Sequence, residues 1–102
     1  LPSQNDTHQD HAVIAQEGFR AFKKGTMLGY EVPWNNLDFR TSCFSKLSED
    51  NLLTKCSSLE KYESQAHRDY ANEEYIRSLA IARGTQMGTK YAEAFEVVRL
   101  VI

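Results

Sequence analysis

Residues 95–102 read Phe-Glu-Val-Val-Arg-Leu-Val-Ile and give the clearest signal of fold class in this chain. β-Branched and aromatic residues favour strands, and this segment is apolar on both faces instead of alternating. Such a strand is typical of a parallel or mixed sheet that is covered by helices on both sides. The segment therefore predicts an α/β fold with helices elsewhere in the chain.

Two further extended segments are expected upstream, at residues 27–32 and 37–41. The first is short and mostly apolar and stops at Pro33, whereas the second alternates apolar and polar residues like a half-exposed strand. Residues 43–47 continue the second segment or form another strand. Together with residues 95–102, these segments predict a small mixed sheet of three to four strands.

A first helix is expected over about residues 11–24, with Asp10 as its cap and Gly25 as its stop. Its predicted inward face consists of apolar residues that recur at intervals of three and four: Ala12, Ala15, Phe19 and Phe22.

Two more helices are expected between the strands. One follows Ser48, has acidic residues in its first turn and extends to about Gln65. The other follows Asn72 and ends at Gly84. The resulting order, helix–strand–strand–helix–helix–strand, predicts about three helices packed on the sheet, which favours an α/β fold over a helical bundle.

Composition excludes several classes of protein. The 102 residues include 12 Lys and Arg and 14 Asp and Glu, for a formal net charge of −2, which predicts no nucleic-acid partner. No apolar run approaches the roughly 20 residues needed to cross a bilayer, so no membrane span is predicted. The two cysteines, Cys43 and Cys56, form no disulfide framework and no secretory signal is visible, which favours a cytoplasmic location.

The densest cluster of chemically active residues is the histidine segment, residues 6–11 (Asp6-Thr7-His8-Gln9-Asp10-His11). Neutral imidazole binds zinc, and a nearby carboxylate can fix its tautomer by accepting the other ring proton. The alternative is an ordinary polar loop that caps a helix. A structural zinc site, with His8 and His11 joined by Cys43 and Cys56, is a further alternative, and His67 is another possible ligand.

Three other features are candidates for a site. Residues 83–95 contain two glycines four apart and, just before the last strand, Glu93, which would need a partner if it were covered. Residues 62–65 (Tyr62-Glu63-Ser64-Gln65) form a polar helix end. Trp34 and Tyr30 could form an aromatic wall for a sugar ring, although a place in the core is the favoured interpretation.

Taken in order, the histidine segment, residues 62–65 and the pattern Arg83-Gly84-x-Gln86-x-Gly88-x-x-Tyr91-Ala92-Glu93-Ala94-Phe95 resemble the LmbE-like, or PIG-L, family. The resemblance covers essentially the whole chain but only the C-terminal half of a family member. It implies a partial Rossmann-like layered fold and a zinc-dependent de-N-acetylase that acts on N-acetylglucosamine-type sugars and glycoconjugates.

The resemblance also implies roles for individual residues. His11 would be a zinc ligand, His8 would stabilise the oxyanion of the tetrahedral intermediate, and Asp6 and Asp10 would support the ligands or fix the loop. Gln9 stands where the family often has proline. Further residues of the matching motifs, together with Trp34, are possible substrate-binding or structural groups: Trp34, Gln86, Tyr91 and Glu93.

The family's first motif, Pro-His-Pro-Asp-Asp-Glu, supplies the other zinc ligands and the general base, and it is not found here. Leu1 also stands where an initiator methionine is expected. We therefore expect the parent protein to be a bacterial, cytoplasmic deacetylase and this chain alone to be inactive. Its expected partners are a small-molecule N-acetyl sugar, the missing N-terminal half and other copies of itself. The alternative is a non-catalytic α/β binding module of the same ancestry.

Overall fold

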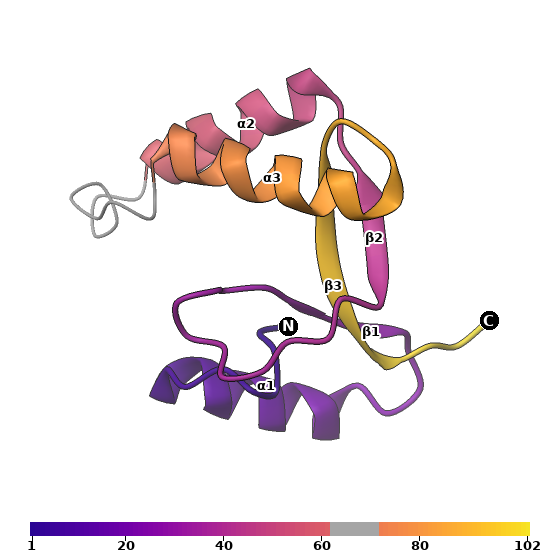
Figure 1. The fold of residues 1–102 in the computed structure, drawn as a ribbon. Helices are drawn as coiled ribbons and strands as arrows, with labels where there is room; N and C mark the ends of the chain where they lie inside the picture. Colours follow the sequence, from indigo (N-terminus) through magenta and orange to yellow (C-terminus); the bar gives the residue numbers. More distant parts are fainter. Residues whose placement is uncertain (62–71) are drawn as a thin grey trace. The chain divides into compact units, whose positions relative to one another are not determined.

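The computed structural model describes residues 1–61 and 72–102 and shows three helices and a three-stranded sheet (Figure 1). The elements follow in the predicted order: α1 (Gln9–Ala21), β1 (Met27–Tyr30), β2 (Cys43–Lys46), α2 (Glu49–Glu60), α3 (Glu73–Met87) and β3 (Ala92–Arg99). The α/β class is therefore confirmed. No helix in the described part of the chain is long and apolar enough to cross a membrane.

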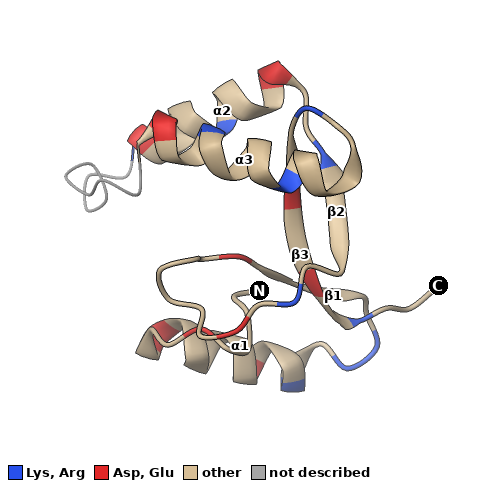
Figure 2. Ribbon diagram, in the orientation of Figure 1, with Lys and Arg blue, Asp and Glu red and all other residues tan. Residues whose placement is uncertain are grey.

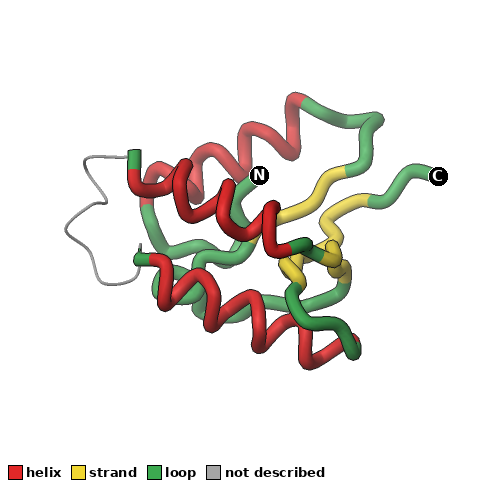
Figure 3. Tube along the Cα trace, turned by 90° about the horizontal axis from the view of Figure 1, so that it is seen from above, coloured by secondary structure: helices red, strands yellow, loops and turns green. Residues whose placement is uncertain are grey.

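The sheet has the order β1-β3-β2, so the last strand lies in the middle. β1 and β3 are antiparallel, with Leu28 opposite Val97 and Tyr30 opposite Phe95. On the other side of β3, the backbone nitrogen of Leu47 donates to the carbonyl of Tyr91 at 3.0 Å. The predicted small sheet is therefore present (Figure 3).

The chain divides into two compact units. Unit 1 consists of Leu1–Cys43 and Ala94–Ile102, and unit 2 consists of Phe44–Glu93. Unit 1 holds the histidine segment, and unit 2 holds the helix pair α2 and α3.

Unit 1 contains a parallel pairing next to β1. The carbonyl of Leu1 accepts a hydrogen bond from the nitrogen of Tyr30 at 2.8 Å, and its amino group donates to the carbonyl of Leu28 at 3.1 Å. Pro2 forms an isolated parallel bridge with Tyr30. Residues 1–3, α1 and β1 thus form a β-α-β arrangement, in which loops at the carboxyl ends of the extended stretches meet at one edge.

The inward face of α1 differs from the prediction. Ala15 is buried, but Phe19 and Phe22 are 41% and 64% exposed. The helix also begins earlier and ends earlier than predicted, with His8 rather than Asp10 as its cap and with Ala21 as its last residue.

In unit 2 the predicted helix starts are correct. Ser48 caps α2 in a reciprocal pair with Asn51, and the side chain of Asn72 caps α3 by accepting from the nitrogen of Tyr75. Acidic residues occupy the first turn of each helix, where they complement the helix dipole (Figure 2). α2 ends at Glu60, and the predicted end at Gln65 lies outside the described residues.

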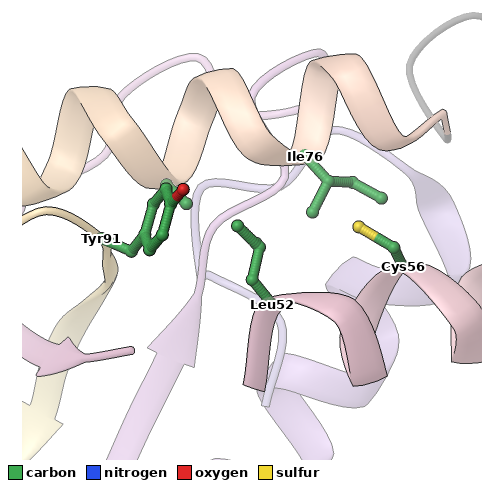
Figure 4. Close-up of a cluster of buried hydrophobic side chains, with 5 residues drawn as sticks. Leu52, Cys56, Ile76 and Tyr91 are labelled. Atoms are coloured by element: carbon green, nitrogen blue, oxygen red, sulfur yellow. The ribbon is translucent and has the colours of Figure 1, made fainter. Parts of the chain in front are cut away.

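The core of unit 2 lies between α2, α3 and the start of β3 (Figure 4). Its buried members come from α2, from α3 and from the residue just before β3: Leu52, Cys56, Ile76, Ala80 and Tyr91. Burial raises the pKa of the Cys56 thiol, so this cysteine is an inert core residue.

Three further predictions about elements were wrong. α3 does not end at Gly84 but continues to Met87, and Gly88, at φ 75°, ends it. Residues 37–41 form a loop rather than a strand. The segment 95–102 is not covered on both sides, because the strand stops at Arg99 and the three residues after it are exposed.

Candidate functional site

The histidine segment lies at the start of α1, directly after the extended residues 1–3. His8 is the N-cap and has extended backbone angles, φ −69° and ψ 126°. Its Nδ1 accepts a hydrogen bond from the backbone nitrogen of Asp10 at 3.2 Å. The cap therefore holds the His8 ring by one nitrogen and leaves Nε2 available.

Asp6 is the buried centre of this segment. Its side chain has no exposed surface, and its two oxygens accept separate hydrogen bonds. Oδ1 accepts from the backbone nitrogen of His8 at 2.8 Å, and Oδ2 lies 2.8 Å from Nδ1 of His11. A carboxylate can only accept, so Nδ1 of His11 carries the proton.

The two imidazoles therefore present different nitrogens. In the neutral ring, protonation at Nδ1 leaves a lone pair on Nε2 of His11, which is a form that binds a metal. His8 accepts at Nδ1, so its neutral ring carries the proton on Nε2 and is a donor. The rings are stacked, with centroids 4.6 Å apart. The Nε2 acceptor of His11 and the Nε2–H donor of His8 thus belong to neighbouring rings.

A second loop is bonded to the histidine segment. The backbone nitrogen and the hydroxyl of Thr7 both donate to the carbonyl of Asn35, at 2.8 and 2.9 Å. Asp6 also forms an antiparallel bridge with Asn36. This second loop follows β1, and we call residues 32–36 the tryptophan turn. The two loops therefore meet at the edge that the β-α-β arrangement predicts.

The tryptophan turn is closed by its own hydrogen bonds. The nitrogens of Asn35 and Asn36 donate to the carbonyl of Val32 at 2.9 and 3.0 Å, and Oδ1 of Asn36 accepts from the nitrogen of Val32 at 2.8 Å. Nδ2 of Asn36 is buried with no partner in the described part of the chain. Trp34 is 47% exposed, so its predicted place in the core is wrong.

Negative charge at Asp6 affects a neighbour on β1. Burial, and then the charge of Asp6, raise the pKa of the Tyr30 hydroxyl. Tyr30 therefore stays neutral at physiological pH. Of the predicted aromatic pair, only Trp34 is exposed on the site's loop, since Tyr30 is partly buried.

Sequence reasoning missed several residues that hold this site. Thr7 and Asn35 were not singled out, and neither was Ser3, whose buried hydroxyl donates to Oε2 of Glu96 at 2.5 Å. The available signal was the presence of turn-forming Asn and Thr residues in two loops that follow parallel extended segments.

The other predicted site residues lie in unit 2 and have partners there. The hydroxyl of Tyr91 accepts from Arg77 at 2.9 Å, and Glu93 forms an ion pair with Lys55 at 3.2 Å. Gln86 accepts from Arg83 at 2.8 Å. These contacts are structural, and Glu93 has the partner that its position required. Residues 62–65 and His67 lie outside the described residues.

The donor chemistry of His11 fits a zinc ligand, because a buried carboxylate fixes its tautomer with Nε2 free. Over residues 1–61 and 72–102, however, no three metal-ligating side chains come together, and this includes the set His8, His11, Cys43 and Cys56. The described residues thus offer one prepared ligand and not a complete site.

No protein-family model matches this chain, and neither a curated protein nor a solved structure gives a significant match.

Proposed function

We propose that this chain is part of a metal-dependent hydrolase of the LmbE-like type, which removes an N-acetyl group from an N-acetylglucosamine-type sugar or glycoconjugate. The observation that carries the proposal is the pair of stacked imidazoles, which differ in whether Nε2 is an acceptor or a donor. Buried Asp6 leaves the Nε2 lone pair of His11 free, while the cap leaves an N–H on Nε2 of the stacked His8. Hydrolysis of an amide on a metal needs both a ligand and an oxyanion donor.

Each residue has a definite task in this proposal. Zinc, when bound, would polarise the amide carbonyl and lower the pKa of a water molecule. Nε2 of His11 would be one ligand, and Asp6 would keep it in the binding tautomer. The Nε2–H of His8 would donate to the oxygen that becomes negative in the transition state.

One ligand cannot hold a catalytic metal, which needs about three protein ligands. The proposal therefore assigns the remaining ligands and the general base to an N-terminal half, and it assigns a cytoplasmic location to the whole enzyme. The chain of residues 1–102 is inactive on its own under this proposal. Metal-dependent release of acetate by the purified chain would contradict that assignment.

The test of the ligand assignment uses the chain itself. Zinc is added in steps while the imidazole nitrogens are followed by long-range ¹H–¹⁵N NMR. We expect the Nε2 resonance of His11 to shift at a lower zinc concentration than that of His8. In His11→Ala we expect zinc to cause no shift at the remaining His8 imidazole. Gln16→Ala, an exposed change on the same helix, is the matched control and keeps the zinc response of wild type. The assignment would be overturned if the His8 resonance shifted first, or if zinc shifted the His8 resonance equally in His11→Ala and in wild type.

The test of the catalytic role uses the longer enzyme that carries the full ligand set. There, His8→Ala lowers kcat for acetate release by about 10²–10³-fold and leaves zinc content unchanged, because an oxyanion donor is lost but no ligand is lost. His11→Ala lowers both the activity and the zinc content. Loss of zinc in His8→Ala would assign it as a ligand and contradict the role proposed here.

A further inference from the structure

We propose that unit 1 carries a docking surface for anionic lipid membranes, formed by residues 19–28 and 97–102, which we call the basic apolar surface. Its exposed apolar side chains enter the outer part of the lipid layer, and its cations contact the anionic headgroups. The inference uses neither histidine and does not depend on the proposed function.

The first observation is the charge of these two segments. They contain four cationic side chains, Arg20, Lys23, Lys24 and Arg99, and no acidic one, whereas the rest of the chain holds eight Lys and Arg and all 14 Asp and Glu. Figure 2 shows basic residues at the end of α1 and in the loop that follows it. Arg20 lies 4.0 Å from Glu17, but both side chains are mostly exposed, so this pair is weak. The segments are thus locally positive in a chain of net negative charge.

The second observation is that hydrogen bonds join the two segments into one surface. Oγ1 of Thr26 donates to the carbonyl of Val101 at 3.1 Å and accepts from the nitrogen of Val101 at 3.0 Å. The guanidinium of Arg99 donates to the carbonyl of Phe22 and lies 5.0 Å from the centre of the Phe19 ring. The last turn of α1, the loop after it and the residues after β3 are therefore neighbours within unit 1.

The third observation is the exposure of large apolar side chains among these cations. Phe22, directly before the two lysines, is 64% exposed, and Leu100 and Val101 are 61% and 51% exposed. Phe22 also borders an open cavity of about 220 Å³, whose other lining residues are Leu1, Thr26, Met27 and Leu28. The surface thus presents apolar groups and positive charge together.

An anionic bilayer offers a partner for both features, because hydrocarbon lies directly beneath its charged headgroups. Single-stranded nucleic acid also offers negative charge, but its bases bind by stacking on aromatic rings, and Leu100 and Val101 have no ring. A second copy paired face to face would bring like charges together. Association of copies through residues 100–102 alone leaves the lysines uncovered.

The test is co-sedimentation of the chain with lipid vesicles. We expect binding to vesicles of phosphatidylcholine that contain phosphatidylserine, and much weaker binding to vesicles of phosphatidylcholine alone. The double change Lys23→Gln with Lys24→Gln lowers the affinity about 25-fold, because each basic residue near an anionic surface contributes about fivefold. Phe22→Ser lowers it about tenfold, because apolar area no longer enters the lipid.

Matched controls come from unit 2. Lys46→Gln with Lys61→Gln makes the same change in net charge at two exposed positions and keeps the affinity within about twofold of wild type. Leu53→Ser, at an exposed position on α2, is the control for Phe22→Ser and leaves the affinity unchanged.

Three outcomes overturn the inference. The first is no sedimentation of the wild-type chain with the phosphatidylserine vesicles, and the second is an equal loss of affinity in the two double-lysine variants. The third is tighter binding of the chain to a single-stranded RNA than to these vesicles, which would assign the surface to nucleic acid. The zinc titration of the imidazoles is a separate measurement, so failure of this inference leaves the proposed function in place.

Discussion

Among single residues, Asp6 has the largest influence on the candidate site. Its two oxygens lie 2.8 Å from the nitrogen of His8 and from Nδ1 of His11, and His11 lies one turn before the buried Ala15, whereas Phe19 and Phe22 are exposed. The hydrophobic pattern places Ala15, Phe19 and Phe22 on one inward face, but α1 ends at Ala21, so Phe22 lies beyond the helix. The preference of one buried carboxylate for an imidazole is not visible in such a pattern.

Replacing the carboxylate tests this view. Asp6→Asn puts an amide where two donors point, the nitrogen of His8 and Nδ1 of His11, so one buried donor loses its acceptor. We expect a loss of about 1–3 kcal/mol in the free energy of unfolding, measured by urea denaturation. Asp38→Asn, at an exposed position, is the control and stays within about 0.5 kcal/mol of wild type. Equal stability of the two variants would show that the Asp6 contacts contribute nothing.

The chemically active residues of the site were predictable, but the residues that hold the two loops together were not. Asp6, His8 and His11 stand out because histidine and aspartate are concentrated in one short segment. Thr7 and Asn35 are common turn residues, and their hydrogen bond joins positions 28 residues apart. No local pattern reports such a pairing.

At the level of elements, helix starts were predicted better than helix ends. Ser48 and Asn72 cap the helices that they precede, because capping depends on a side chain and a backbone a few residues away. Residues 37–41 alternate like a strand, but the nitrogen of Arg40 donates to the side chain of Glu96 instead of a strand carbonyl. A segment with alternating apolar and polar residues forms a strand only if its backbone also pairs with a neighbouring strand.

The end of α3 depends on a close approach between Gly84 and the backbone of Thr89 and Lys90. A Cβ at Gly84 would lie 2.6 Å from the carbonyl oxygens of Thr89 and Lys90, so this glycine lets the chain return tightly after the helix. Gly84→Ala is expected to lower the free energy of unfolding by about 1–3 kcal/mol, although alanine is the better helix former. Urea denaturation measures the change. Gly25→Ala, where nothing lies within 4 Å, is the control and causes no loss.

The contact between α2 and α3 predicts a dependence on pH. Hydrogen bonds from Arg77 and then Tyr91 lower the pKa of Glu49 below its ordinary value of 4.5, and Nη2 of Arg77 lies 2.8 Å from Oε1 of Glu49. A carboxyl whose pKa is lowered by folding stabilises the fold above its ordinary pKa, and this contribution is lost as the pH falls through the folded-state value. Acidification therefore weakens this helix pair.

Thermal unfolding of Glu49→Gln measures the contribution. We expect the variant to have a lower Tm than wild type at neutral pH, and the difference to shrink as the pH falls below 4.5. Ser57→Ala, at an exposed and uncharged position on α2, is the control, and its difference in Tm from wild type does not change with pH. A difference in Tm that stays constant with pH would exclude an ionic contribution from Glu49.

For the whole molecule, the central place of β3 limits how copies can associate. β3 has β1 and β2 as neighbours, so another copy of the chain cannot pair with it as a further strand. The apolar residues after it remain exposed, namely Leu100, Val101 and Ile102, and so do Val13 and Ile14 on α1 and Phe22 just after that helix. Apolar side chains that stay exposed favour association where they gather into a patch.

We therefore expect the chain to self-associate through its last three residues, with an average mass by light scattering that rises with concentration. Leu100→Asp lowers that rise, because a charge is placed in the apolar surface. Leu53→Asp, an equally drastic change at an exposed position on α2, leaves it as in wild type. A mass that stays monomeric at every concentration would contradict the prediction.

The division into units has a consequence for how such a chain can change over evolution. Unit 1 is discontinuous in sequence, and unit 2 enters it between Cys43 and Ala94, at two neighbouring strands. Every hydrogen bond described for the histidine segment and the tryptophan turn joins residues of unit 1. In the sequence, unit 2 is therefore an insertion into unit 1, and its helices could be lengthened, shortened or exchanged for a tight hairpin without altering any residue that forms the site.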